Sequence, residues 1–139
     1  MKEVLTYKGC VLRWECDSNG HMNVMYYINK FENGGHNFMV EMGLASYLSD
    51  KRATTGSVVL EQKINYYKEV FEDDVLYINS KVVGISNKTI SVQHMMYNGM
   101  TDMEVAKMEV VLVLFDKVKR RALPIPSNIR EGLTKLIEE

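Results

Sequence analysis

The fold is decided by the stretch Asp17-Ser18-Asn19-Gly20-His21-Met22-Asn23, a polar loop between two segments of different pattern. Asp and Asn hydrogen-bond to nearby backbone and tolerate left-handed conformations, and Gly accepts a positive φ, so the stretch predicts a turn. An extended segment ends there. From Asn23 to about Met42 the apolar residues recur at helical spacing, which predicts that a long helix begins where the turn ends.

The predicted helix carries signals at both of its ends. Asn23 is a typical N-cap, and Gly43 is placed to be the left-handed residue after the last turn. The pair Gly34-Gly35 inside the helix costs stability unless the backbone must lie close to a flat surface such as a sheet. Polar residues Lys30, Asn33, Asn37 and Glu41 fall largely outside the apolar stripe, which consists of Ile28, Phe31, Gly35, Phe38, Met39 and Met42.

Extended segments account for most of the remaining chain. Residues 4–17 predict an opening strand, with Val11–Cys16 as its most β-prone part. Four further strands are expected over 58–67, 75–85, 89–97 and 103–119, followed by a short helix over 128–138 that Ser127 caps. We therefore expect one α+β domain over residues 1–139, with a five-stranded antiparallel sheet, one long helix on a sheet face and a short C-terminal helix.

Composition excludes several classes of protein. The 139 residues are 46% hydrophobic and 25% charged, as in ordinary globular domains, and 17 Lys and Arg against 18 Asp and Glu disfavour a nucleic-acid partner. The longest apolar run, Val110–Phe115, is too short to cross a membrane, and no secretory signal is visible. Cys10 and Cys16 are too far apart on one strand to form a disulfide. A cytoplasmic protein without membrane contact is expected.

One face of the predicted sheet lacks a cover. Val59, Val83, Val111 and Val113 are expected on the face away from the long helix, and the chain contains no second layer for it. A second copy of the chain is the simplest cover. We therefore expect a homo-oligomer, either a dimer or a dimer of dimers.

The loop also suggests chemistry. The first turn of a helix presents unpaired N–H groups with partial positive charge, which polarise a carbonyl oxygen as it becomes an oxyanion. Asp17 on the loop supplies a carboxylate that can act as nucleophile or general base, and Val24 supplies a first-turn amide. Both parts of an acyl-transfer site thus lie within eight residues. No Gly-x-Ser-x-Gly motif supports a serine hydrolase.

The run from Trp14 to Tyr27 resembles the N-terminal motif of hotdog-fold acyl-CoA thioesterases of the 4-hydroxybenzoyl-CoA thioesterase type. The resemblance implies a hotdog fold, in which the sheet wraps around the long helix, and hydrolysis of a small-acyl CoA thioester. It implies that Asp17 is the catalytic carboxylate and that the Val24 amide holds the thioester carbonyl. His21 and Asn23 would shape the loop and cap the helix. Among relatives, the run Gly20–Asn33 is similar to betainyl-CoA thioesterases of carnitine degradation.

The resemblance also concerns the substrate. CoA is part of the substrate, so neither a cofactor nor a metal is expected. We assign substrate or CoA contacts to Tyr27, whose ring can face a cationic acyl group, to Gln62, which can orient water, and to Lys88, which lies near the family's phosphate-binding position. Ser86-Asn87 replaces part of the basic cluster of some relatives.

Other interpretations of these residues remain open. Asp17 alone suits a turn, His21 a structural loop hydrogen bond and Lys88 a solvated turn. A hotdog hydratase acts on the same thioesters, but its Asp and His are usually further apart than Asp17 and His21. A hotdog protein that binds acyl-CoA without catalysis is the second alternative.

Overall fold

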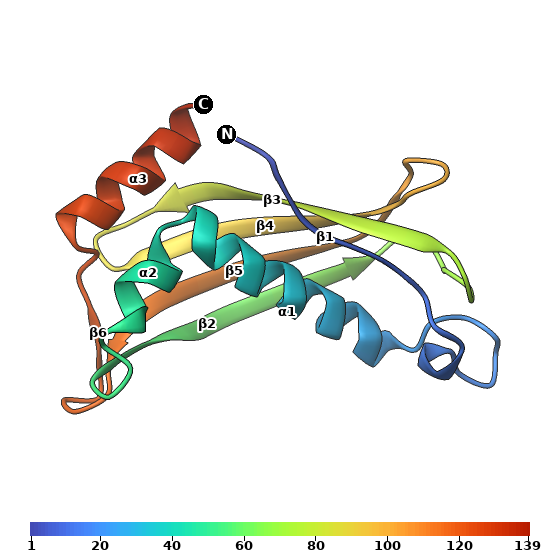
Figure 1. Cartoon of the computed structure of the whole chain (residues 1–139), viewed down its shortest axis with the longest axis horizontal. Helices are drawn as coiled ribbons and strands as arrows, with labels where there is room; N and C mark the ends of the chain where they lie inside the picture. The colour runs from blue at the N-terminus through green and yellow to red at the C-terminus, as the bar shows by residue number, and fades with distance from the viewer.

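The computed structural model describes residues 1–139 and has one antiparallel sheet with helices on one side (Figure 1). The strand order is β1-β3-β4-β5-β2, and a short β6 pairs with β5. The elements in chain order are β1 (Val4–Cys10), a 3₁₀ helix (Arg13–Glu15), α1 (Val24–Glu41), α2 (Leu44–Ser49), β2 (Thr55–Tyr66), β3 (Val75–Ile85), β4 (Thr89–Asn98), β5 (Glu104–Asp116), β6 (Arg121–Leu123) and α3 (Ser127–Glu138).

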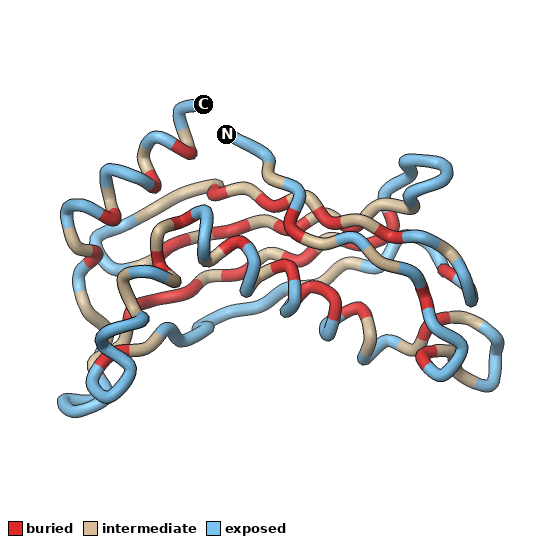
Figure 2. The backbone as a smooth tube through the Cα atoms, in the orientation of Figure 1, coloured by how far each residue is buried: buried red, intermediate tan, exposed pale blue.

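Helix α1 lies along one face of the curved sheet, and the core fills the space between them (Figure 2). Phe31 and Phe38 of α1 are fully buried against this face. The predicted close approach at Gly34 is confirmed, because a Cβ there would meet the Thr6 hydroxyl at 3.1 Å. The five-stranded sheet around one long helix is therefore the arrangement that the sequence predicted, with β6 as a short addition.

Both predicted ends of α1 are confirmed. The side-chain oxygen of Asn23 accepts a hydrogen bond from the Met25 amide at 3.0 Å, so Asn23 is the N-cap. Gly43 has a φ of 76°, and it separates α1 from the short helix α2 that sequence patterns did not indicate. The chain direction at both ends of the helix is thus set by local side-chain and backbone chemistry.

Three local predictions were wrong. Residues 11–16 do not continue the first strand, because the Glu15 carboxylate accepts the Leu12 amide at 2.8 Å and closes a 3₁₀ turn. On α1, Ile28 is exposed and Lys30 is buried, the reverse of the predicted stripe. Ser127 is the first residue of α3 and makes no capping bond, since Pro126 occupies the N-cap position.

A β-bulge in β2 changes which side chains face α1. Val59 pairs with Leu112, whereas Glu61 pairs with Val111, so Leu60 is the extra residue between them. Because paired residues share a sheet face, Val59 lies on the helix side with Leu112 and not on the outer face, where it was predicted. Val59 therefore gives no support to the argument for a covered outer face.

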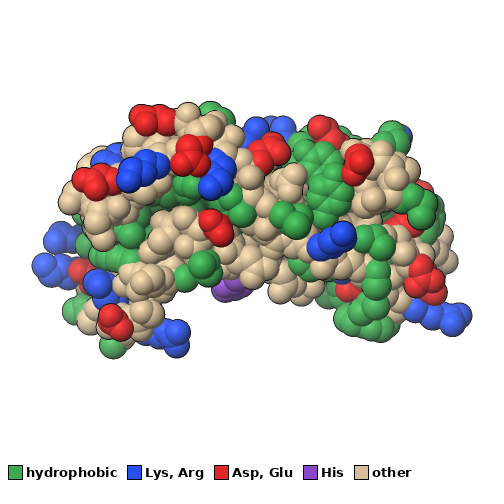
Figure 3. Space-filling model, turned by 45° about the horizontal axis from the view of Figure 1, so that its top comes forward, with side chains coloured by type: hydrophobic (Ala, Val, Ile, Leu, Met, Phe, Trp, Pro, Cys, Tyr) green, Lys and Arg blue, Asp and Glu red, His purple; other side chains and the backbone are tan.

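The surface shows no concentration of one charge. In Figure 3 Lys and Arg side chains alternate with Asp and Glu over the visible face, consistent with the net charge of −1. None of the helices has the length and apolar character needed to span a membrane.

Candidate active site

Asp17 lies in a tight turn that precedes the N-terminus of α1. The Asp17 amide donates to the His21 carbonyl at 2.9 Å, and the Gly20 amide donates to the Asp17 carbonyl at 3.0 Å. Gly20 has a φ of 86°, which meets the predicted need for a residue without a Cβ. One carboxylate oxygen, Oδ1, accepts the Asn19 amide at 2.9 Å. The turn therefore fixes Oδ1, whereas Oδ2 accepts no backbone hydrogen bond.

His21 stands between two carboxylates. Its Nε2 is 3.4 Å from Asp17 Oδ2, and its Nδ1 is 3.3 Å from Glu69 Oε1. A neutral imidazole has one N–H and can donate to one of them, whereas an imidazolium donates to both. The Asp17 and His21 side chains are each 26% exposed, while Glu69 is 66% exposed. Glu69 was not among the predicted site residues. The one sequence signal that could have indicated it is its position in a charged turn.

The start of α1 offers an unpaired amide beside this carboxylate. The Asn23 side chain accepts the Met25 amide, and the Asn23 carbonyl accepts the Tyr26 amide. The amide of Val24 has no hydrogen-bond partner within the chain. Val24 is 55% exposed. A free amide at a helix N-terminus is the arrangement that stabilises a developing oxyanion.

These groups share one hollow of about 360 Å³. Tyr27 forms part of its wall, and its hydroxyl donates to the Lys68 carbonyl at 3.3 Å. Burial, followed by the negative charge of Glu69 and by Tyr66, raises the pKa of Tyr27 above its usual value, so the phenol stays protonated. The tyrosine rings around the hollow are those of Tyr27, Tyr66 and Tyr67. Predicted residues Asp17, His21, Asn23, Val24 and Tyr27 are thus brought together.

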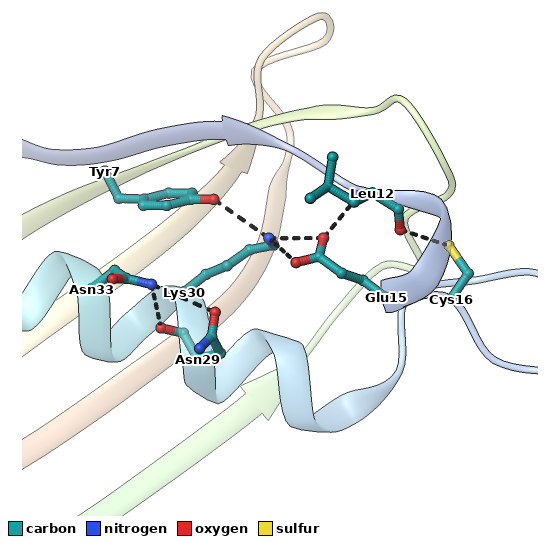
Figure 4. Close-up of polar contacts among 7 residues, drawn as sticks. All are labelled: Tyr7, Leu12, Glu15, Cys16, Asn29, Lys30 and Asn33. Carbon is teal, nitrogen blue, oxygen red and sulfur yellow. Dashed lines mark hydrogen bonds and ion pairs between the residues drawn. The ribbon is translucent and has the colours of Figure 1, made fainter.

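A buried ion pair fastens this loop to the helix (Figure 4). Lys30 Nζ lies 3.0 Å from both carboxylate oxygens of Glu15 and 3.4 Å from the Tyr7 hydroxyl, and the Lys30 and Glu15 side chains are only 3% and 4% exposed. The Glu15 carbonyl also accepts the Asn23 amide at 2.8 Å. Glu15 thus holds the segments before and after Asp17, a role that its sequence pattern did not indicate.

Two predicted residues lie away from this group. Gln62 is exposed on the helix-facing side of β2, beyond Tyr66 and Ile64, and it does not line the hollow. Lys88 lies in the turn between β3 and β4, near α3 and at the opposite end of the sheet from Asp17 (Figure 1). The eleven residues of β3 alone span about 35 Å at 3.3 Å per residue. Lys88 therefore cannot act with Asp17 of the same chain on the reacting group.

Solved structures of other proteins share this fold. A structure of a Staphylococcus aureus protein in complex with CoA superposes with a TM-score of 0.86 at 18% identity, over 99% of this chain and 87% of the other. A 1,4-dihydroxy-2-naphthoyl-CoA thioesterase from Synechocystis gives a TM-score of 0.82 at 12% identity, over 97% and 98% of the two chains. No curated protein is similar enough in sequence to match. Residues 10–133 match the thioesterase-like superfamily. The chain therefore belongs to the thioesterase-like superfamily and is an enzyme of the thioesterase class.

Proposed function

We propose that the protein hydrolyses acyl-CoA thioesters to a free acid and CoA, with Asp17 as the catalytic carboxylate. The observation that carries the proposal is that Asp17 and the unpaired Val24 amide line one hollow. A thioester carbonyl that accepts a hydrogen bond from Val24 becomes more electrophilic and turns its carbon toward the loop. Asn23 supports this function by keeping its own side chain on Met25, which leaves the Val24 amide available.

Two routes use the same atoms. In the nucleophilic route, Asp17 Oδ2 attacks the carbonyl carbon, the C–S bond breaks, CoA leaves as the thiolate and takes a proton from solvent, and water then hydrolyses the mixed anhydride. In the general-base route, Asp17 takes a proton from water as the water attacks the same carbon, the C–S bond breaks, and the CoA thiolate takes up a proton. His21, placed 3.4 Å from Asp17, orients the carboxylate in either route.

The direct test measures release of free CoA thiol from a panel of acyl-CoAs by the wild-type protein. Hydrolysis of at least one of them is expected. If every acyl-CoA binds and none releases thiol, the protein is a non-catalytic acyl-CoA-binding protein. If an enoyl-CoA gains water across its double bond while its thioester stays intact, the protein is a hydratase.

The panel includes betainyl-CoA because the resemblance extends to that type. The rings of Tyr27 and Tyr66 meet edge to face with centroids 5.1 Å apart, and both line the hollow with Tyr67. Aromatic faces attract quaternary ammonium groups. The pair formed by Trp14 and Tyr26 lies outside the hollow, so the rings that support a cationic acyl group are those of Tyr27, Tyr66 and Tyr67.

We also propose that the protein assembles through β2. This strand is at the edge of the sheet, twelve residues long, and its middle exposes Val58, Val59 and Leu60 by 37%, 49% and 60%. A long apolar edge strand pairs readily with another strand. Antiparallel pairing of two β2 strands would bring the far end of the partner sheet beside the hollow.

We expect sedimentation velocity at micromolar concentration to give at least twice the 16.0 kDa of the chain. Leu60→Asp, which places a charge on the edge strand, is expected to shift the protein to the monomer. Met100→Asp is the matched control, because Met100 is 91% exposed in the turn between β4 and β5 and far from this edge. A wild-type monomer would remove the assembly proposal.

The substrate or CoA contacts that we propose for Lys88 and Gln62 depend on this assembly. A partner chain paired through β2 brings its Lys88 end toward the hollow, where a lysine can meet the phosphates of CoA. We expect Lys88→Ala to raise KM for acyl-CoAs several-fold at low salt and less at high salt, with kcat unchanged. Lys8→Ala, an exposed lysine of β1 at the opposite edge of the sheet from β2, is the control. A KM that is the same for wild type and Lys88→Ala at all salt concentrations would contradict the assignment.

A further inference from the structure

A chain of three buried polar side chains crosses the sheet beneath α1. Thr6 Oγ1 lies 3.3 Å from the Ile78 carbonyl and 2.7 Å from Ser80 Oγ, and Ser80 Oγ lies 2.5 Å from His94 Nδ1. Thr6, Ser80 and His94 are 5%, 0% and 4% exposed. The proposed thioesterase chemistry uses none of them. Buried polar chains of this kind fix the positions of their hydrogens, because every donor needs an acceptor.

Counting hydrogens assigns the tautomer of His94. If Thr6 donates to the Ile78 carbonyl, Ser80 donates to Thr6 and His94 Nδ1–H donates to Ser80, and all three contacts become hydrogen bonds. In the reverse direction Thr6 donates to Ser80 and Ser80 donates to His94 Nδ1, so the Thr6 hydroxyl has no hydrogen left for the Ile78 carbonyl. Burial lowers the pKa of His94 to about 4, so the ring is neutral at neutral pH. Its Nε2 is then a bare acceptor, and it has no hydrogen-bond partner in the chain.

His94 lines a cavity of about 110 Å³ between α1 and the sheet. Its Nε2 lies 4.0 Å from the position of a Cβ on Gly35, another lining residue, so the glycine keeps the space beside this nitrogen open. Most of the wall is apolar, and its polar side chains besides His94 are those of the exposed Glu32, His36 and Ser57. A water-sized group needs about 10–15 Å³ of such cavity volume, so the cavity has room for several groups of that size.

The cavity lies further along α1 than the Asp17 hollow, and the two share no lining residue. Both lie between α1 and β2, and Phe31 of the cavity follows Val24 of the hollow by seven residues, or about 10 Å along the helix. An extended chain covers this distance in about eight bonds. We propose that this cavity receives the far end of the acyl group and that His94 Nε2 selects acyl groups that carry a hydroxyl or N–H donor there. The proposal rests on the proposed thioesterase function.

An unpaired acceptor that faces the cavity explains the selection. A tail with a hydroxyl gives Nε2 its missing hydrogen bond, whereas an alkyl tail excludes water and leaves the nitrogen unpaired at a free-energy cost. Sites built to bind a hydroxyl discriminate far more strongly than sites that sense one methylene group.

The experiment compares straight-chain acyl-CoAs of increasing length with their ω-hydroxy counterparts, by kcat/KM and by calorimetric binding to Asp17→Asn, which leaves the thioester intact. We expect the hydroxylated member to be favoured by about tenfold or more at the length that reaches His94. His94→Asn, whose amide can replace Nδ1 toward Ser80 but not Nε2, should abolish the preference. Ser80→Ala, which releases the tautomer, should reduce it, and Asn33→Ala, on the exposed side of α1 and outside the cavity lining, should retain it.

The outcomes separate this proposal from the proposed function. Equal or better use of the alkyl member at every length by the wild type overturns the role of His94, and so does a preference that survives His94→Asn. If no acyl-CoA is hydrolysed, the thioesterase proposal fails, and the binding ratio on the same pairs still decides the role of His94. If His94→Asn does not fold, the wild-type ratio and the Ser80→Ala variant carry the test.

Discussion

Asp17→Asn is expected to lower kcat on the best acyl-CoA by more than about a hundredfold and to leave KM nearly unchanged. Asparagine keeps the size of the side chain and its acceptor for the Asn19 amide, so the turn survives. What is lost is the negative charge on the oxygen that faces the hollow. General-base assistance alone contributes about 10² to 10⁴ in rate, and covalent participation adds to it.

The measurement is steady-state thiol release together with circular dichroism, to show that the variant is folded. Asp50→Asn is the matched control, since Asp50 is exposed after α2 and far from the hollow. A folded Asp17→Asn enzyme with near-normal kcat would contradict the mechanism and direct attention to Glu69 and His21. Label found in Asp17 after a single turnover of the wild type in oxygen-18 water would establish the nucleophilic route, because only a mixed anhydride opened at the aspartyl carbonyl leaves label there.

The features predicted most accurately from the sequence depend on local chemistry. Gly20 and Gly43 adopt positive φ, and Asn23 caps α1, because each effect needs only a few neighbouring residues. The bounds of β3 agree for the same reason, since charged and polar turns flank it on both sides. The juxtaposition of Asp17 with the start of α1 follows from these local features, and it made the site predictable.

The features that sequence patterns missed depend on distant partners. Lys30 has the character of a surface residue until Glu15, fifteen positions earlier, is folded against it. The bulge at Leu60 is hidden because Val58, Val59 and Leu60 are all apolar, so a shift of one residue leaves the alternation plausible. The position of Lys88 at the far end of the sheet follows from strand length and topology, which a turn motif does not contain.

The ion pair that sequence patterns missed gives the largest expected effect on stability. Lys30→Met removes the positive charge and leaves the Glu15 carboxylate buried, with the Leu12 amide as its one remaining hydrogen-bond donor. Breaking a buried pair from one side destabilises proteins by about 3–5 kcal/mol, because the remaining charge is desolvated without a partner. We expect urea denaturation to show a loss of this size in the free energy of unfolding.

A second variant shows whether the loss comes from the stranded charge. The double variant Glu15→Gln with Lys30→Met removes both charges and keeps an acceptor for the Leu12 amide, so it should recover most of the stability. Lys135→Met on α3 is the matched control, because Lys135 is an exposed helix lysine and the change should stay within about 0.5 kcal/mol. Equal losses in the single and double variants would contradict this account and indicate that the lysine stem contributes through packing. A double variant that is stable but has a reduced kcat would show that the pair also holds Asp17 in position, since Glu15 connects the Leu12 and Asn23 ends of its loop.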